Sequence, residues 1–347
     1  MTTAPKLRVG VIWAGLFASL RPLPDLAASP EAEVVAVCRR DPAALGTVAA
    51  HFGVPHRFTD YQRLLDEVPL DAAVVSSPHG LHFEHVRAAL RRDLAVLTDR
   101  PLAVTAAEEL RDLAIRRRPL LVAFGPPYTP AWRSFRSQIA RGAIGPVQLA
   151  QHYSATNADA LGFFGRGAFP ADAPAVVPPP AFRASAALGG GGYLQDVGSH
   201  HLGGILLATG LRPLEVSATL DPPEVELRAA VTVRCADGAL VTTTALANAL
   251  PATGTYLSTG QTVLLGTEGG FQTGEGGAPP LRLRWGQPAV PVDPEALPPR
   301  TSPVANLIGV VRGREEPLVP LDAAVEVVRV IAAAYRSARE RRPMPLA

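Results

Sequence analysis

The chain has 347 residues, 47% of them hydrophobic and 18% charged, which is enough for more than one packed core and excludes general disorder. Lys and Arg number 33 against 31 Asp and Glu, so the net charge of +2 lacks the basic excess of a nucleic-acid-binding protein. No apolar run reaches the roughly 18 residues of a membrane span, and Met1 to Gly10 lacks the apolar region expected of a signal peptide. Cys38 and Cys235 lie far apart in strand-like runs, which predicts two buried thiols and a cytoplasmic protein.

Residues 1–125 alternate short apolar runs with helical patterns. We expect strands at 7–13, 33–38, 71–76, 94–97 and 120–124, and helices at 41–52, 82–92 and 105–117. Thr105 and Glu108 have the spacing of a capping box at the start of the last helix. The alternation predicts an α/β domain with a doubly wound parallel sheet, a Rossmann dinucleotide-binding domain.

A proline-rich segment at 126–130 marks the start of a second domain, residues 126–347. We expect helices at 132–141 and 321–339, strands at 147–154, 214–219, 225–235, 239–246 and 262–266, and a loop over the site at 157–187. Asp237-Gly238 predicts a hairpin turn. This pattern indicates an α+β domain with a large, open, mainly antiparallel sheet. Its β-branched outer face needs a cover, so we expect a homodimer or homotetramer.

The first strand-to-helix turn matches a dinucleotide-binding fingerprint in part. Gly15 and Ala18 occupy the second and third positions of the G-x-G-x-x-G/A pattern, and Trp13 replaces the first glycine. A glycine turn without a ligand is the alternative explanation. The candidate cofactor residues of this turn are Trp13, Ala14, Gly15, Leu16 and Phe17.

Two arginines, Arg39 and Arg40, follow the second strand. An acidic residue at this position would bind the ribose hydroxyl of NAD, whereas guanidinium groups suit the 2′-phosphate of NADP. The sequence therefore predicts NADP as the cofactor and NAD as the second choice. A solvated basic turn is the alternative.

Four motifs occur in sequence order along the chain. They are Ser77-Pro78-His79-Gly80-Leu81-His82, Thr98-Asp99-Arg100-Pro101-Leu102, Gly189-Gly190-Gly191 with Asp196-Val197-Gly198-Ser199-His200, and Gly266-Thr267-Glu268-Gly269. With them the chain resembles the glucose-fructose oxidoreductase / inositol dehydrogenase / MocA family over nearly its whole length. The resemblance implies a nicotinamide cofactor and hydride transfer to or from a secondary alcohol or ketone of a sugar, cyclitol or related small molecule.

The resemblance also assigns residues. It implies cofactor contacts from Ser77, Pro78, His79, His82, Asp99 and Arg100, and a substrate site with Arg100, Asp196 and His200. On a helix, Asp196 and His200 would share one face, where His200 could exchange the alcohol proton and Asp196 orient it. A buried structural histidine and a helix-capping Asp196 are the alternative. No metal is expected, because no further His or Cys accompanies the pair at ligand spacing.

Three residues depart from the family pattern. Trp13 replaces a glycine, His79 replaces an asparagine, and Arg100 replaces the motif lysine; Lys6 is the only lysine of the chain. Arginine supplies charge and hydrogen bonds but does not release its proton. The alternative function is therefore a non-redox member of the family, such as a lyase, isomerase or cyclase, or a binding protein.

Overall fold

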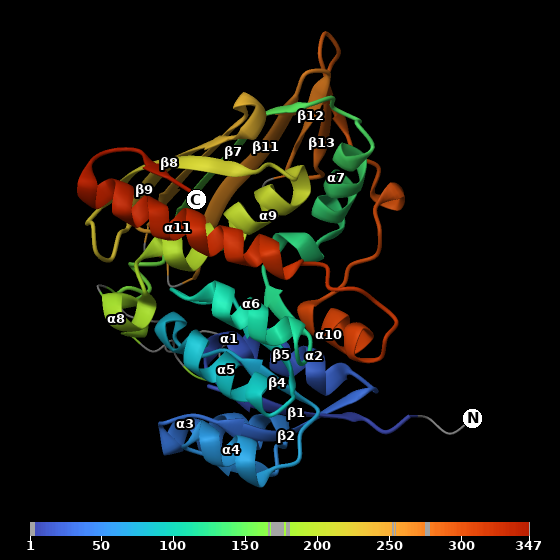
Figure 1. Ribbon diagram of the computed structural model, residues 1–347, viewed down its shortest axis with the longest axis vertical. Helices are drawn as coiled ribbons and strands as arrows, with labels where there is room; N and C mark the ends of the chain where they lie inside the picture. The colour runs from blue at the N-terminus through green and yellow to red at the C-terminus, as the bar shows by residue number, and fades with distance from the viewer. Residues whose placement is uncertain are drawn as a thin grey trace. The chain divides into compact units, whose positions relative to one another are not determined.

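The computed structural model describes residues 4–165, 167, 177, 181–251, 253, 255–274 and 278–346. The chain divides into two compact units (Figure 1). The first contains Met1–Ala123, Ala171–Phe182 and Ser302–Val325, and the second contains Phe124–Pro170, Arg183–Thr301 and Glu326–Ala347. No helix among the described residues is long and apolar enough to cross a membrane. Cys38 and Cys235 are both buried and free, as predicted.

The first unit contains a six-stranded, fully parallel sheet in the order β3-β2-β1-β4-β5-β6. Its strands are β1 Leu7–Ile12, β2 Ala32–Cys38, β3 His56–Phe58, β4 Ala72–Val75, β5 Ala95–Asp99 and β6 Leu120–Ala123. The predicted doubly wound sheet is confirmed. The central strands are apolar because helices cover both faces of such a sheet.

The helices of this unit are α1 Leu16–Leu20, α2 Pro22–Ala28, α3 Pro42–Phe52, α4 Tyr61–Glu67, α5 His82–Arg91, α6 Ala107–Ile115 and α10 Pro303–Val311. Pro22, which has no backbone N–H, follows the break between α1 and α2 at Arg21. Val304, Leu307 and Ile308 of α10 share one buried core with the residues of β1 and β2. A segment from late in the sequence thus completes the N-terminal unit.

The second unit contains a nine-stranded mixed sheet in the order β14-β13-β12-β11-β7-β10-β9-β8-β15. Its strands are β7 Val147–Thr156, β8 Pro213–Asp221, β9 Arg228–Cys235, β10 Leu240–Leu246, β11 Ser258–Gly266, β12 Gly269–Gln272, β13 Leu281–Arg284, β14 Val290–Pro291 and β15 Met344–Pro345. Among the described strands of this sheet, only β7 and β10 pair in parallel, so the predicted mainly antiparallel sheet is confirmed. The hairpin at Asp237-Gly238 is also confirmed, with φ of 63° and 81°.

Helices lie against one face of this sheet. They are α7 Pro130–Ala140, α9 Ser199–Thr209 and the second half of α11 Leu321–Glu340, whereas the short α8 Ala186–Gly189 precedes the turn that leads into α9. On β7 the residues facing α9 are buried in alternation, and they include the polar side chains of His152, Ser154 and Thr156. The helix-covered face of β7 therefore carries a polar row where an apolar core is usual.

The predicted capping box at Thr105 and Glu108 is wrong. The N-cap of α6 is Ala106, in the left-handed conformation with φ of 56°, and it makes no side-chain cap bond. This turn displaces Thr105 from the capping position. By contrast, Asp41 Oδ1 accepts from the amides of Ala43 and Ala44 at 2.9 and 3.2 Å and caps α3.

Asp41→Ala should therefore lower the free energy of unfolding by about 1 kcal/mol, whereas Thr105→Ala should change it little. Urea unfolding without cofactor measures both variants against the unaltered protein. Equal losses in the two variants would contradict this assignment of the helix caps.

Candidate active site

The turn after β1 has the backbone of a glycine turn although it begins with tryptophan. Trp13 has φ of 65°, in the left-handed region that favours glycine. The Ala14 amide donates to Cys38 O at 2.9 Å, and the Gly15 amide donates to Trp13 O at 2.7 Å. These bonds fix the turn to the end of β2. Trp13 thus preserves the chain path that the missing first glycine would give.

The Trp13 indole lies against Gly15. A Cβ placed on Gly15 would be 3.3 Å from Cδ1 and 3.5 Å from Nε1 of the indole. The indole Nε1 is buried and has no hydrogen-bond partner among the described residues. Leaving a buried donor unpaired costs about 1–3 kcal/mol, so the position is suited to a ligand oxygen. The turn fits a dinucleotide on this ground, with the indole as an additional donor.

Arg39 and Arg40 differ in their surroundings. Arg39 is 7% exposed, and its Nη1 donates to Ala14 O at 3.3 Å. Burial lowers the pKa of the Arg39 guanidinium. Arg40 is exposed, and its guanidinium carbon lies 5.9 Å from the centre of the Trp13 ring. Arg39 therefore braces the turn, while Arg40 presents its charge at the surface.

Two serines at the carboxyl end of β4 have unsatisfied hydroxyls. Ser76 Oγ and Ser77 Oγ are buried without a partner among the described residues. His82, which is fully buried, has ring nitrogens 2.7 Å from Pro101 O and 2.8 Å from Ser77 O. Burial lowers the pKa of His82, although nearby Asp99 and the two carbonyls oppose this shift. His82 connects the loops that follow β4 and β5, and the serine hydroxyls remain for a ligand.

Asp99, Arg100 and His79 form a buried polar cluster at the carboxyl end of β5. The Arg100 amide donates to Asp99 Oδ1 at 2.8 Å, and Arg100 Nη1 lies 3.4 Å from His79 Nε2. All three residues are less than 9% exposed. The arginine that replaces the motif lysine therefore brings a permanent positive charge to this edge of the sheet.

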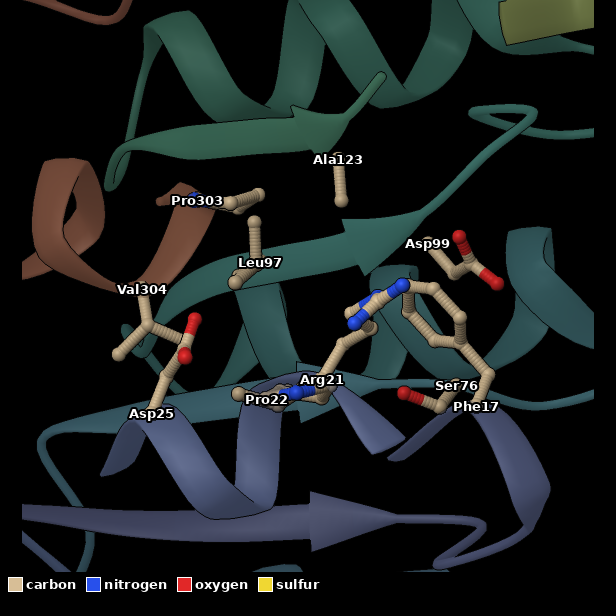
Figure 2. A pocket seen from close by; sticks show the side chains of 11 residues that line it. Phe17, Arg21, Pro22, Asp25, Ser76, Leu97, Asp99, Ala123, Pro303 and Val304 are labelled. Atoms are coloured by element: carbon tan, nitrogen blue, oxygen red, sulfur yellow. The ribbon is translucent and has the colours of Figure 1, made fainter. Parts of the chain in front are cut away.

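A cavity of the first unit opens at the same edge (Figure 2). It encloses about 280 Å³, including space open to solvent. It is lined by Phe17, Arg21, Pro22, Asp25, Val74, Ser76, Leu97, Asp99, Ala123, Pro303 and Val304. In Figure 2 the Phe17 and Arg21 side chains extend toward the strands. Doubly wound sheets bind ligands at the carboxyl ends of their strands. Arg21 was not singled out in the sequence, where its spacing of four residues from Phe17 is the only signal.

In the second unit, Asp196 lies in a π-helical turn, Leu194–Gly198, that leads into α9. The expected helix therefore begins with a turn wider than that of a regular α-helix, and the shared face of Asp196 and His200 remains a prediction. Arg183 Nε donates to Asp196 Oδ2 at 2.6 Å, and both side chains are at most 10% exposed. Sequence reasoning missed Arg183, which lies 13 residues away in a segment without regular periodicity.

His200 has a defined ring orientation. Its Nδ1 accepts a hydrogen bond from the Gly125 amide at 2.8 Å. An accepting Nδ1 carries no proton, so the neutral ring carries its proton on Nε2. Nε2 is therefore the nitrogen through which His200 can donate to another oxygen.

The neighbouring His201 stacks on His152 of β7, with ring centres 3.5 Å apart and an interplanar angle of 19°. His152 Nδ1 lies 2.9 Å from Thr262 Oγ1, and burial lowers the pKa of His152 to about 4. The two imidazoles thus fix α9 against the sheet beside His200. Among the described residues, no group of three or more His, Cys, Asp or Glu side chains could hold a metal ion.

The glycine run before Asp196 packs closely against residues from distant parts of the chain. In the structure, a Cβ on Gly191 would lie 1.9 Å from Tyr335 Oη, and one on Gly192 would lie 2.1 Å from Glu226 O. The glycines therefore make room for Tyr335 and Glu226. The predicted loop at 157–187 lies partly outside the described residues.

Comparisons with known proteins agree with this architecture. A family model described as an oxidoreductase family with an NAD-binding Rossmann fold matches residues 7–123, and the GFO/IDH/MocA C-terminal domain matches residues 132–272. The chain belongs to the Gfo/Idh/MocA family of oxidoreductases. This confirms the family and the nicotinamide-binding class of fold that its motifs indicated.

Several named relatives and structures are similar to parts or all of the chain. A dTDP-3,4-didehydro-2,6-dideoxy-alpha-D-glucose 3-reductase of Saccharopolyspora spinosa is 40% identical over 32% of this chain and 33% of its own length. An inositol 2-dehydrogenase of Acidothermus cellulolyticus is 33% identical over 43% of this chain and 45% of its own. The match thus spans less than half of these relatives. The WlbA dehydrogenase from Bordetella pertussis, solved with NADH and UDP-GlcNAcA, has a TM-score of 0.80 at 19% identity, covering 100% of this chain and 99% of that one.

The buried His152 predicts a pH dependence of stability. Its pKa is near 6.5 in the unfolded chain and about 4 in the folded one, so its contribution to stability is present above pH 6.5 and lost as the pH falls toward 4. Between pH 7 and pH 5 we expect this residue to cost about 2 kcal/mol of unfolding free energy. In His152→Asn, urea unfolding should show a correspondingly smaller loss between these pH values. A pH dependence identical to that of the unaltered protein would contradict the buried neutral ring.

Proposed function

We propose that the chain is an NADP(H)-dependent oxidoreductase that interconverts a secondary alcohol and a ketone on a sugar, cyclitol or related small molecule. The observation that carries the proposal is the carboxyl edge of the parallel sheet. There the Gly15 turn, the unsatisfied Trp13 Nε1 and the exposed Arg40 lie where a dinucleotide fold holds its ligand. Nicotinamide, when bound, supplies or accepts the hydride.

The cofactor contacts follow from the first unit. Gly15 allows a pyrophosphate to approach the backbone closely, and Arg40 offers a guanidinium to a 2′-phosphate. The Ser77 hydroxyl, buried and unsatisfied, suits a polar group of the nucleotide. The binding site thus uses the turn after β1 and the ends of β2 and β4.

The candidate substrate groups are described for each unit by itself: Arg100 in the first, and His200 and Asp196 in the second. Arg100 polarises a carbonyl or holds a substrate carboxylate, and it does not exchange its proton. His200 offers Nε2 to the reacting oxygen, because Nδ1 is engaged by Gly125. Asp196, paired with Arg183, is the carboxylate of the site. The reductase and dehydrogenase relatives, whose names refer to a sugar and to inositol, support the substrate class and do not favour the non-redox alternative.

A screen of the purified protein tests this function. D-glucose, D-xylose and myo-inositol are each offered with NADP⁺ and with NAD⁺, and formation of reduced nicotinamide is followed by its absorbance. We expect turnover with at least one of these compounds and faster turnover with NADP⁺. No turnover together with no binding of NADPH by fluorescence titration would favour the non-redox alternative.

Substitutions of Arg39 and Arg40, the two arginines after β2, should affect cofactor selection differently. Arg40→Ser should weaken NADPH binding by about 1–3 kcal/mol, the range for a charged hydrogen bond, and leave NADH binding unchanged. Arg39→Ser should weaken both cofactors alike, because it removes the brace to Ala14 O. Nicotinamide fluorescence titrations measure all four affinities. Equal losses of NADPH and NADH binding in Arg40→Ser would exclude Arg40 as the phosphate ligand.

His200 should be required for turnover but replaceable in part by another donor. His200→Ala should lower kcat by about 10²–10⁴, the range for a positioned acid–base or hydrogen-bonding group. His200→Gln retains an N–H near the Nε2 position. If His200 acts by donating a hydrogen bond, the glutamine variant should recover at least tenfold over alanine; if it exchanges the proton, both variants should be equally slow. A fully active alanine variant would remove His200 from the reaction.

We also propose that two copies of the chain pair through the outer face of the nine-stranded sheet. Tyr153, Leu240 and Leu246 on this face are 41%, 40% and 38% exposed, and in the β7–β10 register Leu240 lies opposite Leu149. Light scattering at micromolar concentration should show a dimer or tetramer, and Tyr153→Glu with Leu240→Glu should shift it to monomer because buried charges oppose association. A monomeric unaltered protein would contradict this interface.

A further inference from the structure

Glu226 is a fully buried carboxylate in the connection between β8 and β9, and neither the fingerprint nor the family motifs include it. Its Oε2 accepts from the Tyr335 hydroxyl at 2.7 Å and from the Gly192 amide at 2.9 Å, and its Oε1 accepts from the Leu194 amide at 2.5 Å. A buried carboxylate persists only where donors satisfy it. Here the backbone donors belong to the segment that leads to Asp196.

The same segment is held at further points. The Tyr193 amide donates to Glu226 O at 2.8 Å, and the Gly192 amide also lies 3.0 Å from Tyr335 Oη. The three consecutive amides of Gly192, Tyr193 and Leu194 therefore all donate to Glu226. Burial raises the pKa of Glu226, while the Tyr335 hydroxyl and the backbone amides oppose this shift.

The glycines confirm how close this packing is. Atoms added at the Cβ positions of Gly191 and Gly192 would overlap Tyr335 and the Glu226 backbone. The segment cannot approach in this way with any larger residue. The consecutive glycines thus leave the space that Glu226 and Tyr335, which lie far away in the chain, occupy.

The connection to Asp196 is short. Leu194, whose amide binds Glu226, is the first residue of the π-helical turn that contains Asp196. The Asp196 amide in turn donates to Gly192 O at 3.0 Å. Because Leu194 begins the turn that carries Asp196, we expect a displacement at 192–194 to move Asp196 relative to Arg183.

We propose that Glu226, together with Tyr335, is a positioning residue that fixes Asp196 for the oxidoreductase reaction. The proposal rests on the function proposed above. It also predicts that substitutions of Glu226 and Tyr335 change the π-helical turn even when no substrate is present. Tyr335 and Glu226 act through the backbone of Gly192 and Leu194.

Two variants test it. Tyr335→Phe removes one hydroxyl and keeps the ring, and Glu226→Gln replaces one acceptor oxygen with an N–H₂ group that faces a donor. Glu215→Gln is the charge control, because Glu215 pairs with Arg234 on the exposed surface at 3.4 Å. Val233→Ala, in buried β9, is the control for general loss of stability in the same unit.

Hydrogen–deuterium exchange of peptides covering 192–198 is measured first, without substrate. We expect exchange at least tenfold faster in both test variants and unchanged exchange in the two controls. With the substrate of highest turnover in the screen, kcat should fall by about 10- to 100-fold, the range for a misplaced site group, while NADPH affinity stays unchanged. Val233→Ala should keep its kcat even where its unfolding midpoint falls to that of Tyr335→Phe.

Unchanged exchange at 192–198 in both test variants would overturn the proposal, whatever the screen shows. Faster exchange with unchanged kcat would overturn the positioning role and leave a structural one. A lack of turnover by the unaltered protein would instead count against the proposed function. The exchange measurement then still decides whether Glu226 holds the segment.

Discussion

Parallel pairing in the first unit places the carboxyl ends of all its strands on one edge, and the candidate cofactor residues depend on this constraint. Trp13 follows β1, Arg39 follows β2, and Ser77 follows β4. Because the strands are parallel, residues a few positions beyond the ends of separate strands lie together on one surface. The local bonds, such as Ala14 N to Cys38 O, then fix each loop on its neighbour. The chemistry of this edge therefore follows from strand order before any single side chain is considered.

Trp13 and Arg100, which depart from the family pattern, each keep one physical property of the residue that they replace. Trp13 adopts the backbone conformation of the glycine it replaces, so the fold is kept and an indole donor is added. Arg100 keeps the charge of the lysine it replaces but not its exchangeable proton. Gly125 orients His200 so that Nε2 bears the hydrogen of the neutral ring. Arg100 and the Nε2 of the neutral His200 ring are therefore both hydrogen-bond donors.

The elements with a strong hydrophobic pattern could be predicted from the sequence. Features that depend on backbone conformation or on contacts between distant residues could not. The apolar strands β1, β2, β4, β5 and β6 were predicted because they are buried on both faces, whereas β3 is mostly exposed and has no such pattern. The capping box failed because Ala106 adopts a left-handed conformation that residue type does not favour. Arg183 and Glu226 were missed since each acts on a segment remote in the chain. Asp196 and His200 could be proposed from a motif, but the π-helical turn between them could not.

The indole beside Gly15 has a spectroscopic consequence. The chain has three tryptophans, and Trp132 is buried in the second unit while Trp285 is half exposed there. Trp13 alone lies at the nucleotide turn, and reduced nicotinamide absorbs where indole emits. If reduced nicotinamide binds at this turn as proposed, energy transfer from Trp13 would contribute an intrinsic optical signal for its arrival. The residue that stands in place of a fingerprint glycine would then make occupancy of the turn measurable without a label.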